Sequence, residues 1–204
     1  MYPNCIKRIL DCAISGIGLI VLSPVFLILA IAIKLDSRGP VFFRQKRTGK
    51  NNIPFHIYKF RTMKIDTPKD IPTHLLEDPD QYITKMGHFL RKTSLDELPQ
   101  LINIFKGDMA IVGPRPSLTN QYDLNQLRDQ NGASSVRPGL TGLAQISGRD
   151  ELPIPVKADY DGQYARNITF FNDCSLFFKT FTSVLKSEGI QEGKHVPEDE
   201  SCTE

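Results

Sequence analysis

Two adjacent carboxylates, Asp96 and Glu97, stand just before a stretch of apolar residues with helical spacing. One interpretation is structural. Ser94 followed three residues later by Glu97 has the spacing of a capping box, and acids in a first helical turn interact favourably with the helix dipole. The other interpretation is chemical, because one carboxylate can attack phosphorus while the other holds Mg²⁺. The spacing alone is compatible with both.

Basic side chains on rigid segments are the next candidates for chemistry with anions. Pro114 and Pro116 fix the backbone on both sides of Arg115. A guanidinium held in this way suits bidentate phosphate contact or stacking on a base, although a tight turn with a solvated arginine has the same pattern. Lys59 and Arg61 share one face of an expected strand, which is either a binding face or a solvated basic edge.

Two further arginines, Arg137 and Arg149, lie in glycine-rich segments, where backbone amides can approach a phosphate closely. These segments have neither Walker nor Rossmann spacing. The four histidines are scattered along the chain and are interpreted as surface or packing residues. The four cysteines have no CxxC spacing, so no zinc pattern is present and reduced thiols are expected.

A long apolar segment precedes all of these residues, since no charge occurs from residue 12 to residue 33. At about 1.5 Å per helical residue this run could reach across a hydrocarbon core. A signal anchor, a buried core helix and a segment that enters the membrane without crossing it are all compatible with the run. Ser23-Pro24 in its middle predicts a kink, and basic residues on both flanks favour the last interpretation.

The remainder of the chain predicts short strands and short helices. Strands are expected at 41–43, 55–60, 109–112 and near 143–146, with a surface loop at 66–80. Helices are expected at 85–92, 98–105, 118–131 and 174–186. With no internal repeat, these elements predict a helix-rich α+β fold.

Composition limits the classes of protein to consider. The chain has 204 residues, 40% of them apolar and 24% charged, which suits one folded domain and excludes a disordered or polytopic membrane protein. The net charge of +2 is too small to predict a nucleic-acid partner. Residues 34–64 nevertheless carry many lysines and arginines against the single acid Asp36, which favours lipid headgroups or phosphate as a partner.

Several motifs follow one another in a specific order. They are Lys7-Arg8 with Asp11, Ser23-Pro24, Tyr58-Lys59-Phe60-Arg61-Thr62-Met63, Ser94-Leu95-Asp96-Glu97-Leu98-Pro99-Gln100, Lys106-Gly107-Asp108-Met109, Val112-Gly113-Pro114-Arg115-Pro116 and Val136-Arg137-Pro138-Gly139. This succession, from about residue 5 to residue 190, resembles the bacterial sugar transferase family of small monotopic phosphoglycosyl transferases. The length resembles that of the minimal catalytic members.

The resemblance implies an architecture and a location. Residues 1–36 would form a kinked re-entrant membrane helix hinged at Ser23 and Pro24, held in one leaflet of the bacterial cytoplasmic membrane. Residues 37–190 would form a compact catalytic domain on the cytoplasmic face, with short strands and interfacial amphipathic helices. Residues 191–204 are expected to form a flexible tail, and the oligomeric state is left open, with a homodimer as one possibility.

The resemblance also implies a reaction. Asp96 would attack the β-phosphate of a UDP-sugar and release UMP, and a polyprenol phosphate would then take the phosphosugar from Asp96. Glu97 would bind Mg²⁺, and Lys59, Arg115 and Asp161 would lie in the catalytic centre. The implied substrate-binding set is Arg61, Pro114, Arg115, Pro116, Arg137 and Arg149.

The chain departs from the family pattern at three places. Thr48 replaces the proline common between Arg47 and Gly49, which predicts a less rigid loop there. The stretch after Met63 lacks the family's acidic and arginine-rich pattern, and Gly162 and Gln163 replace bulkier residues; these two departures bear on the donor sugar. An N-acetylated amino-deoxy sugar is expected from the similarity to minimal enzymes, with galactose and glucose left open. Two alternatives remain, a membrane-tethered module that only binds anionic lipid and a glycosyltransferase that releases UDP.

Overall fold

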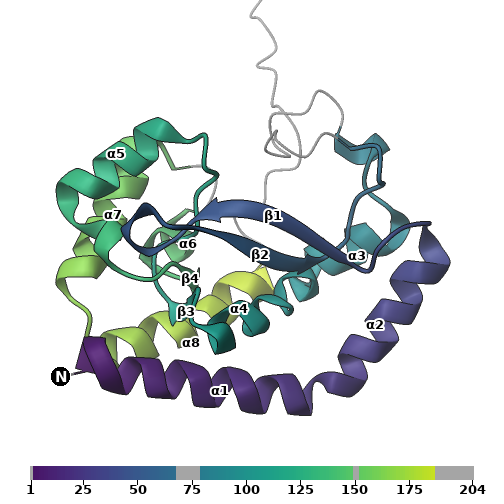
Figure 1. Ribbon diagram of the computed structural model, residues 1–204, viewed down its shortest axis with the longest axis horizontal. Coiled ribbons are helices and arrows are strands. Elements are labelled where there is room, and N and C mark those ends of the chain that lie inside the picture. Colours follow the sequence, from purple (N-terminus) through teal and green to yellow (C-terminus); the bar gives the residue numbers. More distant parts are fainter. Residues whose placement is uncertain (1, 68–78, 149–151, 187–204) are drawn as a thin grey trace, which may run out of the picture.

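The computed structural model describes residues 2–67, 79–148 and 152–186 (Figure 1). Its described part is helix-rich, with two small sheets of two strands each, so the expected α+β class is confirmed. The expected tail at 191–204 and most of the expected loop at 66–80 lie outside the described residues. Within the described ranges there are also four short 3₁₀ turns, at Lys50–Asn52, Pro79–Gln81, Leu95–Glu97 and Ala133–Ser135.

The apolar N-terminal segment forms two helices that meet at an angle. A π-helical turn at Tyr2–Ile6 leads into α1, Lys7–Val21, and α2 follows at Ser23–Asp36. The two helices are bent by 61° relative to each other, which confirms the kink expected from the proline. No single helix in the described ranges is long and apolar enough to cross a membrane, whereas the bent pair meets the criterion when taken together.

An antiparallel hairpin lies above these helices. Strand β1, Phe42–Thr48, is longer than expected, whereas β2, Pro54–Phe60, matches its prediction within one residue. Ile57 packs into the main hydrophobic core, and Phe60 packs into a second core formed largely by α2 and by α3, Lys85–Lys92. The hairpin therefore links the bent helix pair to the centre of the molecule.

The second sheet lies directly before the turn that carries Arg115, because that turn follows β3. Strand β3, Ala110–Val112, runs parallel to β4, Gly139–Thr141. Gly139 lies so close to β3 that a Cβ atom there would stand 2.1 Å from the nitrogen of Gly113. The backbone of β4 can pair with β3 only because residue 139 has no side chain.

The strand expected near 143–146 is wrong, because Leu143–Ser147 forms the short helix α6. The run Leu143-Ala144-Gln145-Ile146 is short and mostly apolar, and periodicity cannot distinguish a strand from a buried helical turn over such a length. The strand of this region lies a few residues earlier, as β4.

The remaining helices surround the two sheets. Helix α4, Gln100–Lys106, packs on α1, and a Cβ atom at Gly16 of α1 would lie only 3.1 Å from the ring of Phe105.

Helix α5, Tyr122–Asn131, begins four residues later than expected, and α8, Phe170–Lys186, begins four residues earlier than expected. Helix α7, Ile154–Arg166, was not predicted. Its buried face consists of small and polar residues as well as tyrosine, which gives a weak apolar period.

A buried polar cluster joins the two ends of the described chain. The carboxylate of Asp173 on α8 accepts hydrogen bonds from Lys7 Nζ at 2.7 Å, from the Tyr2 hydroxyl at 2.7 Å and from the Tyr164 hydroxyl at 2.9 Å. Asp11 accepts one from the backbone nitrogen of Ile111 at 3.1 Å. These contacts fix α1 against α7, α8 and β3.

Candidate active site

The two adjacent carboxylates lie on the 3₁₀ turn Leu95–Glu97, between α3 and α4. Ser94 has a left-handed backbone with φ 55° and makes no side-chain capping hydrogen bond, so the capping-box interpretation is wrong. A non-glycine residue in this region is uncommon and turns the chain sharply. The turn leaves the side chains of Asp96 and Glu97 only 13% and 21% exposed, at the edge of the protein interior.

Lys59 reaches both carboxylates from β2. Its Nζ atom lies 2.7 Å from Glu97 Oε1 and 3.6 Å from Asp96 Oδ2. The buried Asn103 of α4 fixes this strand, because it accepts a hydrogen bond from the nitrogen of Tyr58 and donates one to the carbonyl of His56. The helix that follows the carboxylates thereby also holds the strand that carries Lys59.

Arg115 approaches from the opposite sheet, with Nη2 3.3 Å from Glu97 Oε1. Its backbone turn is held at three successive carbonyls. The oxygen of Pro114 accepts from the nitrogen of Gly139 at 2.8 Å, and the oxygen of Pro116 accepts from Arg47 Nη1 at 3.3 Å. The oxygen of Arg115 itself accepts from Nη2 of Arg128 at 3.0 Å.

The environment separates the two carboxylates electrostatically. Burial raises the pKa of Asp96, an effect that Lys59 opposes and the charge of Glu97 reinforces. Burial also acts to raise the pKa of Glu97, but Lys59 and Arg115 outweigh it and lower that pKa to about 2. At neutral pH the site holds Glu97 firmly ionised, and Asp96 is the more basic of the two carboxylates.

Other predicted residues occupy different places. Asp161 is 1% exposed and forms an ion pair with Arg128 at 2.6 Å. The guanidinium of Arg61 donates to the carbonyls of Ser37 and Arg38, after the end of α2. Arg137 donates to the carbonyl of Gly107 at the end of α4. Arg149 lies outside the described residues, so its place relative to the carboxylates stays a prediction.

The site offers two neighbouring carboxylates to a metal ion. The described part of the chain contains no cluster of three or more His, Cys, Asp or Glu side chains with metal-binding geometry. Mg²⁺ is usually held by one or two carboxylates and completes its octahedron with water and substrate phosphate. Glu97 and Asp96 therefore fit this ion better than they fit a metal that needs an all-protein cage.

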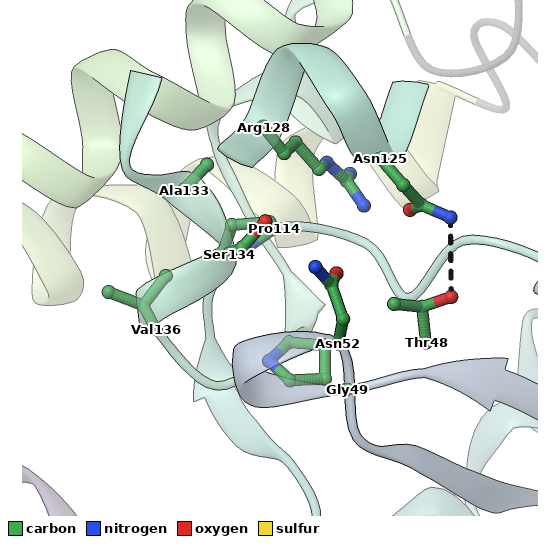
Figure 2. A pocket seen from close by; sticks show the side chains of 10 residues that line it. Thr48, Gly49, Asn52, Pro114, Asn125, Arg128, Ala133, Ser134 and Val136 are labelled. Atoms are coloured by element: carbon green, nitrogen blue, oxygen red, sulfur yellow. Dashed lines mark hydrogen bonds between the residues drawn. The ribbon is translucent and has the colours of Figure 1, made fainter. Parts of the chain in front are cut away.

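Figure 2 shows a small, open hollow behind the turn that carries Arg115. Pro114 and Arg128 line it, together with residues of the β1–β2 loop, α5 and the turn at Ala133–Ser135. Asn125 donates to Thr48 Oγ1 across it at 3.4 Å, and Asn52 donates to Asp129. The hollow separates α5 from the hairpin loop, and Arg128 projects into it toward the turn.

Sequence reasoning missed Asn103 and Arg128, the two residues that hold Lys59 and Arg115 in place. Arg128 follows Leu124 by four positions, and both side chains are buried on the same face of α5. A charge at a core-facing position is a signal that could have identified it. Asn103 gives no comparable signal for its contact with β2, because its partners there are backbone atoms 45 and 47 residues away in sequence.

Comparison with known proteins gives the family. Residues 2–187 match the model of the bacterial sugar transferase family, so the chain belongs to this family. It is 41% identical to an uncharacterized sugar transferase, EpsL, of Bacillus subtilis, covering 94% of this chain and 93% of that one.

Two further relatives carry more specific names. The undecaprenyl-phosphate galactose phosphotransferase of Salmonella typhimurium is 36% identical over 90% of this chain and 41% of its own length. The UDP-glucose:undecaprenyl-phosphate glucose-1-phosphate transferase of Escherichia coli is 38% identical over 86% of this chain and 39% of its own length. The chain thus spans less than half the length of several relatives that it matches.

Proposed function

We propose that this protein transfers a phosphosugar from a UDP-sugar to a polyprenol phosphate, with Asp96 as the nucleophile. The observation that carries the proposal is the cluster of Asp96, Glu97, Lys59 and Arg115, drawn from separate elements to contact distances. Relatives named as undecaprenyl-phosphate sugar phosphotransferases support the substrate classes.

In the first step, a carboxylate oxygen of Asp96 attacks the β-phosphorus of the donor. The bond from that phosphorus to the bridging oxygen breaks, and UMP leaves with the bonding electrons. The sugar phosphate is then held on Asp96 as an acyl phosphate. In the second step, a phosphate oxygen of the polyprenol phosphate attacks the same phosphorus, the bond to Asp96 breaks, and the carboxylate is restored.

Charge stabilisation explains the other members of the cluster. Phosphoryl transfer requires mainly positioning and neutralisation of the charged oxygens around phosphorus. Lys59 holds both carboxylates in place, and Arg115, whose side chain is 43% exposed, can reach a diphosphate while it still contacts Glu97. A Mg²⁺ ion held by Glu97 would supply further charge neutralisation on the donor phosphates.

The acceptor lipid requires a membrane-associated enzyme, and α1 and α2 suit a re-entrant arrangement. Their surface exposes large apolar side chains, among them Ile20 at 75% and Leu35 at 83%. Such a surface is unfavourable in water and is typical of contact with lipid. Because α1 and α2 are bent by 61°, the pair can enter one leaflet, and the carboxyl end of α2 can return to the headgroup region. That arrangement would place the acceptor phosphate at the depth of the catalytic domain.

The topology has a direct test. In a background without the native cysteines, Asn4→Cys and Ser37→Cys are labelled in intact and permeabilised cells by a reagent that does not cross membranes. A re-entrant pair predicts that both positions react only after permeabilisation. Labelling from opposite sides would contradict the re-entrant arrangement and would favour a spanning helix.

The reaction is tested by the nucleotide that leaves. Nanodisc-held protein is incubated with Mg²⁺, a polyprenol phosphate and a panel of UDP-sugars that includes N-acetylated amino-deoxy sugars, galactose and glucose. UMP is expected from at least one donor, and its release should stop in Asp96→Asn and on chelation. Release of UDP would make the protein a glycosyltransferase. No nucleotide from any donor, with intact binding to anionic vesicles, would favour the lipid-binding module.

A further inference from the structure

A buried ion pair lies behind the turn that carries Arg115. Arg128 of α5 is 6% exposed and Asp161 of α7 is 1% exposed. Both Nε and Nη2 of Arg128 donate to Asp161 Oδ2, at 2.9 Å and 2.6 Å. Neither side chain has a hydrogen bond or ion pair to Asp96 or Glu97 among the described residues.

The second contact of Arg128 points toward the catalytic cluster. Its Nη2 atom also donates to the carbonyl oxygen of Arg115 at 3.0 Å. Hydrogen bonds in which the donor is charged are shorter and stronger than neutral ones, so this contact restrains the carbonyl firmly. The side chain of the same Arg115 contacts Glu97 at 3.3 Å.

We propose that Arg128 and Asp161 are positioning residues, which fix the backbone of Arg115 and thereby aim its guanidinium at Glu97 and the donor diphosphate. The inference rests on the proposed function and deepens it. Asp161 thus acts from a distance, by orienting Arg128.

The construction of the turn explains why such a fixed donor is needed. Pro114 and Pro116 have no backbone N–H, so the turn cannot be closed by hydrogen bonds from these residues. Its three carbonyls are instead held by donors from other segments, and the central one is held by the side chain of Arg128 from α5. Asp161 keeps that side chain in one orientation through its two hydrogen bonds to Nε and Nη2, and without Asp161 the buried charge of Arg128 would be uncompensated.

A purely structural ion pair would have different consequences. Its loss would destabilise the fold and lower activity whatever residue stands at position 115. A positioning pair acts through the Arg115 side chain, so its effect on activity should largely disappear when that side chain is absent. A double-mutant cycle separates the two cases.

The cycle compares wild type, Arg128→Met/Asp161→Leu, Arg115→Ala and the triple variant in nanodiscs. The apolar pair removes both charges together, because buried ion pairs are often replaced by apolar residues without loss of stability. Initial rates of UMP release are measured above the floor set by Asp96→Asn, and thermal unfolding is recorded for each protein. If the apolar pair does not fold, Asp161→Asn provides the same comparison, made once alone and once together with Arg115→Ala.

We expect the apolar pair to lower kcat/KM roughly 10- to 100-fold when Arg115 is present, as for a misplacement of about 1 Å. With Arg115→Ala, the same change should cost less than about threefold. Equal losses in both backgrounds, or no loss in either, would overturn the inference. A wild type that releases no UMP from any donor would overturn the proposed function and, with it, this inference.

Discussion

At the scale of single residues, two neighbouring carboxylates are made chemically different by what surrounds them. The Oε1 atom of Glu97 lies 2.7 Å from Lys59 Nζ and 3.3 Å from Arg115 Nη2. The Oδ2 atom of Asp96 lies farther from Lys59 Nζ, at 3.6 Å, and the negative charge of Glu97 helps to raise the pKa of Asp96. The more basic carboxylate is the better nucleophile, and the more strongly ionised one is better suited to bind a cation.

This difference predicts a pH dependence. Asp96 must be ionised to attack, so kcat/KM should fall as the pH drops through its pKa, which burial raises above the ordinary 3.8. In Lys59→Met a favourable positive charge is lost, the pKa of Asp96 rises further, and the acid limb should move to higher pH. The rate itself should fall roughly 100-fold. The control is Lys46→Met, at an exposed position of β1, and an unmoved acid limb in Lys59→Met would contradict the assignment.

The residues that we propose do the chemistry could be predicted because their motifs are local in sequence. Asp96, Glu97, Arg115 and Lys59 each stand in a short distinctive segment, and the structure brings all of them together. Arg128 could not be predicted in its role, because its contacts join segments 13 and 33 residues apart. Such pairings depend on tertiary packing, which no local pattern encodes.

At the scale of elements, α4 links the parts of the site. It begins three residues after Glu97, and its buried Asn103 holds the backbone of β2 at His56 and Tyr58, just before Lys59. Extended runs with clear alternation, such as β2, could be predicted. The strand β4 and helix α7 could not, because glycines and small polar residues conceal their periods.

Asn103 therefore provides a test of this linkage. Asn103→Leu leaves the nitrogen of Tyr58 and the carbonyl of His56 without their partner, which should destabilise the fold by about 2–4 kcal/mol. Denaturant or thermal unfolding in detergent measures the change, with Gln126→Leu at an exposed position of α5 as the matched control. Equal stability of the two variants would show that α4 does not depend on this contact to hold β2.

At the scale of the whole molecule, residues near the two ends of the described chain hold the bent helix pair in place. Lys7 on α1 and Asp173 on α8 meet at 2.7 Å, with both side chains largely buried. Further along α1, Gly16 allows α4 to approach closely, so the helix lies directly beneath the element that follows the two carboxylates (Figure 1). The kink between α1 and α2 could be predicted from one proline. The packing of α1 against α4 and α8 could not.

Lys7→Met should therefore destabilise the protein strongly, by about 3 kcal/mol, because it leaves the buried Asp173 carboxylate without its counter-charge. The control, Lys34→Met, removes an equal charge from an exposed position of α2 and should change stability little. Thermal unfolding in nanodiscs compares the two. A Lys7→Met protein as stable as Lys34→Met would show that the ion pair does not secure α1.

The central claim is that Asp96 carries the phosphosugar between donor and acceptor. The most direct measurement omits the polyprenol phosphate, adds Mg²⁺ and the active UDP-sugar, and follows the mass of the intact protein and of its peptides. We expect about one UMP released per enzyme and a mass increase of one phosphosugar on the peptide that contains Asp96. Adding the acceptor should remove this mass. Two results would contradict the role of Asp96 as carrier. One is turnover with acceptor present but no adduct at any time, and the other is an adduct on another residue.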